Sequence, residues 1–369
     1  MLASRLVDAQ TREYRVARTS PGGVGHHVDL RSNSFDALRL GLAVLVIVSH
    51  AFPISGLADE PRIGDIKLGT LAVAGFFSVS GYLVTGSRLR TRAGAFAWRR
   101  FLRIYPGYWV CLVFTAFVAA QIGGAVRGGW DPVNATAHVL SGVLMFGTLP
   151  LDTASLAGAP LAGSWNGSLW SLPYEVICYL AVGVGFTLGW VRRAGWLVVI
   201  SFAAATAASL VVVPRTDHGF LRNLLVVGPF FLAGAVFLFY GDRIRLSWRG
   251  ALVAAALLGA AAWAGRAESL AGLPVTYLLL WLSGALPAWT RNWGHRADLS
   301  YGMYLYGFPL QQLLVVAGIQ QLGAGVFVAL SLAVTAPVAC LSWFLVERPA
   351  MRLRNRFSNR RQAPDARLS

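Results

Sequence analysis

The side chains that could do chemistry are few, and three of them lie near the start of the chain. His50 follows Arg39 by eleven residues, and Asp36 precedes Arg39 by three. Eleven residues of α-helix make three full turns plus about 20°, so Arg39 and His50 would share one face about 16 Å apart. An imidazole can accept and return a proton near neutral pH, which suits a general base. A hydrogen-bonded histidine with a purely structural role is the alternative.

Six arginines without an intervening acid lie between positions 88 and 103. Arg100 and Arg103 are three apart, so on a helix they would project together. Paired guanidinium groups suit bidentate binding of phosphates, such as those of a nucleotide-bearing substrate. Charge placed only for membrane orientation or lipid contact is the alternative.

A third group of candidates surrounds Glu175, in the sequence Trp170-Ser171-Leu172-Pro173-Tyr174-Glu175. Ser171 precedes Glu175 by one turn and would lie on the same face of a helix. A carboxylate in an apolar segment could hold a proton, orient a substrate hydroxyl or neutralise an arginine such as Arg39. A structural ion pair and a catalytic role are both open for Glu175.

The elements that must position these residues are membrane helices. The 369 residues are 56% hydrophobic and 13% charged, whereas a soluble domain carries about 25% charge. Ten apolar segments are long enough to cross about 30 Å of hydrocarbon. They lie near 35–54, 69–86, 104–122, 169–190, 196–213, 223–240, 250–265, 272–289, 301–319 and 325–346. We therefore expect an all-α polytopic membrane protein with about ten transmembrane helices.

A shorter apolar run at 138–149 ends at Pro150 and favours a re-entrant or interfacial segment. With ten spans and a cytoplasmic N-terminus, 25 of the 32 basic residues fall on the inside and 6 on the outside. This distribution obeys the positive-inside rule and accounts for the net charge of +16 without nucleic acid. We expect both termini in the cytoplasm.

The chain divides by composition into a polar cytoplasmic arm at 1–32, a transmembrane domain at 33–349 and a basic cytoplasmic tail at 350–369. The three cysteines lie in apolar runs rather than at metal-ligand spacing, so we expect no metal site.

The order of several short motifs resembles the acyltransferase-3 family of multi-pass membrane O-acyltransferases. Arg39 and His50, with ten residues between them, resemble the arginine and histidine that open the family's domain. The segment Gly75-Phe76-Phe77-Ser78-Val79-Ser80-Gly81-Tyr82-Leu83 is similar to the family's motif in the second span. The other similar segments are Arg100-Phe101-Leu102-Arg103-Ile104-Tyr105-Pro106, Trp170-Ser171-Leu172-Pro173-Tyr174-Glu175, Ser300-Tyr301-Gly302-Met303-Tyr304-Leu305 and Val346-Glu347-Arg348-Pro349. Many members carry Trp-His before a late proline, whereas this chain reads Tyr306-Gly307-Phe308-Pro309.

The resemblance implies an acyl-CoA donor, often acetyl-CoA in this family, and no permanently bound cofactor. The acceptor would be a hydroxyl of an envelope polysaccharide, oligosaccharide or lipid-linked glycan at the bacterial inner membrane. His50 would act as general base or transient acyl carrier, with Arg39 and Glu175 as further catalytic residues. Arg100 and Arg103 would bind the donor, and Asp36, Ser80, Trp170, Ser171 and Tyr301 are further candidates. The expected form is a stand-alone transferase without an esterase-like domain.

Two other functions compete with this interpretation. In a proton-coupled transporter or lipid-linked glycan flippase, Arg39, His50 and Glu175 would form a path through the membrane. A non-catalytic scaffold would need none of this chemistry. Acceptor selectivity is expected in the outer loops at 53–68 and 123–168, where no motif identifies the acceptor.

Overall fold

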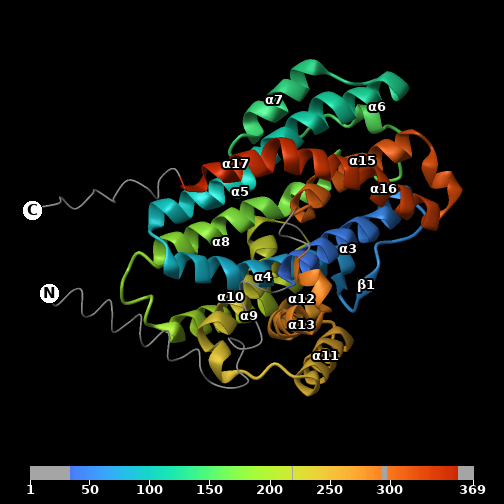
Figure 1. The fold of residues 1–369 in the computed structure, drawn as a ribbon. Coiled ribbons are helices and arrows are strands. Elements are labelled where there is room, and N and C mark those ends of the chain that lie inside the picture. The colour runs from blue at the N-terminus through green and yellow to red at the C-terminus, as the bar shows by residue number, and fades with distance from the viewer. Residues whose placement is uncertain (1–33, 218, 293–296, 356–369) are drawn as a thin grey trace, which may run out of the picture. The chain divides into compact units, whose positions relative to one another are not determined.

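The computed structural model describes residues 34–217, 219–292 and 297–355 (Figure 1). The predicted arm at 1–32 and the tail beyond residue 355 lie outside the described residues. The longer helices are α3 (Phe35–Ser55), α4 (Leu68–Arg90), α5 (Ala93–Phe114), α8 (Leu172–Gly185), α9 (Gly195–Val212), α10 (Phe220–Tyr240), α11 (Trp248–Trp263), α13 (Gly272–Ala285), α15 (Ser300–Val316) and α16 (Ala324–Ser342). Shorter elements are the strands β1 (Arg62–Ile63) and β2 (Ile66–Lys67) and the helices α6 (Ala120–Arg127), α7 (Pro132–Gly142), α12 (Ala267–Leu270) and α17 (Arg348–Arg352).

Each of the ten predicted apolar segments coincides with a helix, which confirms an all-α polytopic membrane protein. Seven continuous helical stretches are long and apolar enough to cross a membrane: Phe35–Ser55, Leu68–Arg90, Ala93–Arg127, Gly167–Gly185, Gly195–Arg215, Phe220–Arg243 and Ala324–Arg352. α11 and α13 are apolar but only 16 and 14 residues long, and α15 has 17 residues. Ten crossings therefore stay a prediction.

The short apolar run predicted at 138–149 contains the second half of α7. This helix begins six residues earlier than predicted, because Asp131 caps it: its carboxylate accepts hydrogen bonds from the backbone N–H groups of Val133 and Asn134 at 2.9 and 3.1 Å. α7 ends at Gly142, and Met145 follows with a φ of 66°. Eleven residues of helix span about 16 Å and cannot cross the hydrocarbon.

Contacts within the chain define two compact units. Among the described residues, unit 1 comprises 34–42, 62–86, 189–217 and 219–292, and unit 2 comprises 43–61, 87–188 and 297–355. In unit 1, α9 and α13 both pack against α10, and α11 packs against α13. One apolar core of this unit is formed by Phe35, Leu38, Val79, Tyr82, Phe237, Leu246 and Leu280.

A close approach of two helices in unit 1 joins α4 to α10 through two glycines. A Cβ atom at Gly81 would overlap the carbonyl oxygen of Phe231, and one at Gly234 would overlap the carbonyl oxygen of Ser78. Only glycine permits this approach of two backbones, as at small-residue interfaces of other membrane helices. The glycine of the second-span motif, Gly81, is thus explained by packing.

Unit 2 is built around α15, which packs against α5, α6 and α16 (Figure 1). α5 runs on through the π-helical segment Thr115–Ala119 into α6, and the 3₁₀ segment Gly167–Ser171 leads into α8. A core cluster of this unit comprises Ala51, Ile54, Ala119, Ala120, Leu156, Ala159, Trp165, Phe308, Val315, Val316 and Phe327.

Candidate active site

One face of α15 contacts several parts of the candidate site in unit 2, among them His50, Arg103 and Ser171. Tyr301, Tyr304, Phe308 and Gln311 are spaced by three or four residues and therefore lie along one side of the helix. Seven residues separate Tyr301 from Phe308, which is about 10 Å along the axis. All four side chains are buried, so this face can hold reacting groups away from bulk water.

His50 lies near the end of α3, where its side chain is 18% exposed. Its Nδ1 atom lies 3.6 Å from Oε1 of Glu60, which accepts a hydrogen bond of 2.9 Å from the hydroxyl of Ser49. On another side, the imidazole meets the ring of Phe308 edge-on, with 5.4 Å between ring centroids. The carboxylate on Nδ1 leaves Nε2 as the atom of the imidazole that can exchange a proton with a substrate.

Glu60 was missed from the sequence because it lies in a connection without a recognisable motif. The chain leaves α3 at Ser55 and turns at Gly56, whose φ of 70° favours glycine. Pro160 packs on this turn, 2.7 Å from where a Cβ of Gly56 would lie. The reversal returns Glu60 to the histidine ten residues earlier. An acidic residue soon after His50 was the only available signal.

Two glycines set the position of α15 and of Phe308 beside His50. A Cβ at Gly167 would lie 2.8 and 2.9 Å from two atoms of the Phe308 ring. A Cβ at Gly307 would lie 2.7 Å from the side chain of Ile47, one turn before His50 on α3. Gly307 occupies the position at which many family members have the late histidine. In this chain, α15 packs closely against Ile47 of α3 at that position.

Arg103 lies on the helical entrance to the third span, as predicted, but its charge is already compensated. Its guanidinium lies 2.6 Å from the Asp298 carboxylate, 3.7 Å from that of Glu347 and over the ring of Tyr301 at 5.5 Å. Glu347 is 2% exposed and also accepts a hydrogen bond from Ser342. Three of the motifs noted in the sequence meet in this network, which joins α5, α15 and the end of α16.

Arg100 has different surroundings, although it lies one turn from Arg103 on α5. Its guanidinium stands 5.7 Å from the centre of the Tyr179 ring, and the Tyr179 hydroxyl donates a hydrogen bond to Glu175. Among the described residues, the Nε atom of Arg100 has no hydrogen-bond partner. Arg100 therefore fits an anion better than Arg103 does.

Arg88 is a structural residue rather than a free charge. It is 1% exposed, and its guanidinium donates hydrogen bonds of 3.0 Å to the carbonyl oxygens of Gly183 and Thr91. These bonds hold the end of α8 against the start of the connection to α5. Of the six arginines, Arg90 and Arg92 are exposed.

The candidates around Glu175 contact α15 and each other. Ser171 is buried, and its hydroxyl lies 2.7 Å from that of Tyr304, which also donates a hydrogen bond to the carbonyl oxygen of Ser168. The Trp170 ring packs on Tyr174 with 6.0 Å between centroids. The Tyr301 hydroxyl donates to the carbonyl oxygen of Ile104 at 2.7 Å.

Asp36, Arg39 and Ser80 belong to unit 1, and each is partly buried. Asp36 and Arg39 share the continuous helix α3 with His50, which confirms that their spacing is helical. Ser80 adjoins Gly81 at the crossing of α4 and α10. Roles for these three residues remain predictions from the sequence.

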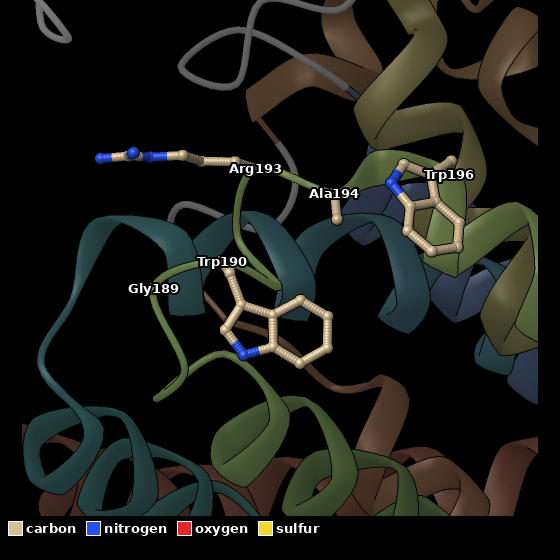
Figure 2. A pocket seen from close by; sticks show the side chains of 5 residues that line it. All are labelled: Gly189, Trp190, Arg193, Ala194 and Trp196. Carbon is tan, nitrogen blue, oxygen red and sulfur yellow. The ribbon is translucent and has the colours of Figure 1, made fainter.

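An open pocket in unit 1 lies where the chain enters α9 and is lined by Gly189, Trp190, Arg193, Ala194 and Trp196 (Figure 2). Trp190 and Trp196 are 60% and 56% exposed. Its lining contains neither a nucleophile nor a carboxylate or imidazole, so this pocket offers no group for acyl transfer. Tryptophan beside arginine is typical of the membrane interface.

Comparisons with known proteins agree with the geometry. The acyltransferase domain of the acyltransferase-3 family matches residues 32–345. An O-acetyl transferase of Shigella phage Sf6 is 30% identical over 331 residues, covering 86% of this chain and 96% of that protein. Nodulation protein 10 of Rhizobium leguminosarum bv. viciae is 30% identical over 375 residues, covering 92% and 99%. No solved structure matches significantly. This chain therefore belongs to the acyltransferase-3 family and is a multi-pass membrane O-acyltransferase.

Proposed function

We propose that this enzyme moves an acetyl group from acetyl-CoA to a hydroxyl of a bacterial envelope glycan or glycolipid. The contact of His50 with the Glu60 carboxylate, 3.6 Å from Nδ1, is the observation that carries this proposal. A relative is described as an O-acetyl transferase, which supports acetyl as the group transferred. We propose ten spans in the inner membrane, with both termini in the cytoplasm, from the arginine distribution.

In the proposed reaction, Nε2 of His50 takes the proton from the acceptor hydroxyl while that oxygen attacks the thioester carbonyl carbon. Breaking of the carbon–sulfur bond then releases the thiolate of coenzyme A, and the imidazolium returns the proton to that sulfur. The Glu60 carboxylate stabilises the imidazolium, and the Ser49 hydroxyl fixes that carboxylate. Transient acylation of His50 is the second route, in which the acceptor attacks an acyl-imidazole.

Arg100 contributes to binding the phosphates of the donor in this scheme. Arg103 stands next to it but is held by Asp298 and Glu347, so we assign to it the positioning of α5 against α15. The contacts of Arg103 and His50 with α15 lie about 10 Å apart along the helix. The extended pantetheine arm of acetyl-CoA can cover such a distance. Glu175 is assigned to orienting Tyr179 beneath Arg100.

Transfer from radiolabelled acetyl-CoA in membrane vesicles that contain the native envelope glycans tests the proposal. Label should enter glycan with the wild type and fall at least about 100-fold with His50→Ala, as expected for loss of a general base. Glu60→Gln should lower kcat about 10-fold with unchanged KM for acetyl-CoA, because the imidazolium loses its partner. A folded His50→Ala enzyme with full activity would exclude His50 as base and as acyl carrier.

The matched control is His138→Ala, because His138 lies on α7 with its Nδ1 bonded to the carbonyl oxygen of Leu149. This variant should keep its activity. Transport of glycan across vesicles without acyl-CoA would instead support the transporter alternative.

A further inference from the structure

Gln311 is the most deeply buried polar side chain on the face of α15 that contacts α3. It is 0% exposed, and its Nε2 atom donates a hydrogen bond of 2.8 Å to the carbonyl oxygen of Ile47. In the part of the chain that the structure describes, its Oε1 atom has no hydrogen-bond partner. A buried acceptor without a partner costs about 1 to 3 kcal/mol, so such atoms are rare in folded proteins.

Helix geometry places the Gln311 amide beside the turn of α3 that contains His50. The carbonyl of a helical residue points toward the residue four positions later, so the carbonyl of Ile47 points into the turn that contains His50. The Gln311 amide that meets this carbonyl therefore lies beside that turn. Phe308, one turn before Gln311 on α15, meets the imidazole itself.

The orientation of the amide is fixed by its neighbour. A backbone carbonyl can only accept, so Ile47 requires the NH₂ group of Gln311, and the oxygen must face the other way. This oxygen can receive only an N–H or O–H donor.

We infer that Oε1 of Gln311 accepts a hydrogen bond from an N–H or O–H group of the substrate that occupies the His50 site. This inference rests on the proposed function. The donor group belongs either to the pantetheine arm of acetyl-CoA, which carries amide N–H groups, or to a hydroxyl of the acceptor glycan. Nothing in the sequence patterns singled out Gln311.

Gln312 provides a matched control on the next position of the same helix. It is also 0% exposed, and among the described residues its Oε1 atom likewise has no hydrogen-bond partner. Its Nε2 atom, however, donates to the carbonyl oxygens of Leu161 and Ser164 at 2.7 and 2.9 Å, rather than to α3. Gln311→Met and Gln312→Met each replace a buried amide by an apolar side chain of similar length. Gln311→Met removes one hydrogen bond to a backbone carbonyl, and Gln312→Met removes two.

The experiment measures the KM of acetyl-CoA at saturating glycan, and the KM of polysaccharide extracted from the native envelope at saturating acetyl-CoA. Gln311→Met should raise one of the two values about 5- to 20-fold, as expected for one hydrogen bond. A rise for acetyl-CoA identifies the pantetheine arm, and a rise for polysaccharide identifies the glycan. Gln312→Met should leave both KM values within twofold, with a similar loss of thermal stability.

Two results would overturn the inference. Both KM values could stay within twofold for folded Gln311→Met, or Gln312→Met could raise the same KM equally, which would attribute the effect to helix packing. If the wild type transferred no label, the proposed function would fall, and the inference with it. Wild-type transfer with an unaffected Gln311→Met enzyme would overturn the inference alone.

Discussion

Both units of the protein use glycine where helices pack closely, but two glycines of unit 1 meet backbone atoms and two of unit 2 meet side chains. In unit 1, Gly81 and Gly234 let the backbones of α4 and α10 touch. In unit 2, Gly167 instead makes room for the side chain of Phe308, which contacts the imidazole of His50. Gly307 makes room for the side chain of Ile47, one turn before His50 on α3. The first arrangement holds two helices together, whereas the second shapes the surroundings of His50, the proposed general base.

A glycine within a sequence motif therefore does not by itself indicate a functional residue. A glycine against backbone cannot be replaced without moving a whole helix. A glycine against a side chain can be replaced if that side chain gives way. Substitutions in the two units should therefore affect different measured quantities.

The largest effect is expected at Gly81. Gly81→Ala should cost about 3 kcal/mol of stability or more, because its methyl group overlaps a carbonyl oxygen of α10. The yield of folded protein after size-exclusion chromatography in detergent measures this loss. Gly228→Ala is the control on α10, since a Cβ there meets nothing within 4 Å. Normal yield of Gly81→Ala would remove the distinction between the two kinds of glycine.

The next effect separates the two neighbouring arginines of unit 2. Arg103→Gln should lower stability by about 3 to 5 kcal/mol, because it leaves the buried carboxylate of Glu347 and the partly buried carboxylate of Asp298 without the Arg103 cation. Arg100→Gln should keep the thermal unfolding temperature and raise the KM for acetyl-CoA about 10-fold, as expected for one charged hydrogen bond. Stable Arg103→Gln with a raised KM would return Arg103 to donor binding.

A smaller effect tests whether Phe308 positions His50. Gly167→Ala should press Phe308 toward the imidazole and lower kcat about 10-fold, with little loss of folded protein. Phe308→Leu makes room for the added methyl group, so the double variant should recover activity relative to Gly167→Ala. Additive losses in a double-mutant cycle would show that the two positions act separately.

The smallest expected effect is the pH dependence of stability that His138 on α7 causes. Burial lowers the pKa of His138, against the opposing effect of its bond to the Leu149 carbonyl. The unfolded chain then binds this proton more readily than the folded chain does. The free energy of unfolding is therefore highest above the ordinary histidine pKa and falls as the pH drops below it. Between pH 7.5 and 5.5, the wild type should lose about 1 to 2 °C more in unfolding temperature than His138→Gln. An equal loss would contradict this assignment.

The sequence was sufficient for the features that depend on neighbours along the chain. Apolar length located all ten helical segments, and helical spacing placed Arg39 and His50 on one helix. Helical spacing also placed Arg100 and Arg103 on the helix that leads into the third predicted span. The six motifs identified the family, which the match over residues 32–345 confirms.

Partners far away in the chain could not be predicted in this way. The sequence predicts Arg103 as a phosphate ligand, and no sequence pattern connects it to Asp298 and Glu347, which follow it by 195 and 244 residues. Glu60 reaches His50 only through the turn at Gly56, and the start of α7 depends on the cap at Asp131.

The sequence by itself therefore determined the class of protein, the helices and the residues capable of chemistry. Hydropathy and helical periodicity are local properties, and residue types limit which reactions are possible. Only the tertiary structure decided which arginine is neutralised, which carboxylate meets His50 and which glutamine of α15 bonds to α3 beside that histidine. These outcomes depend on how α15 packs against α3 and α5, and that packing joins residues through space rather than along the chain.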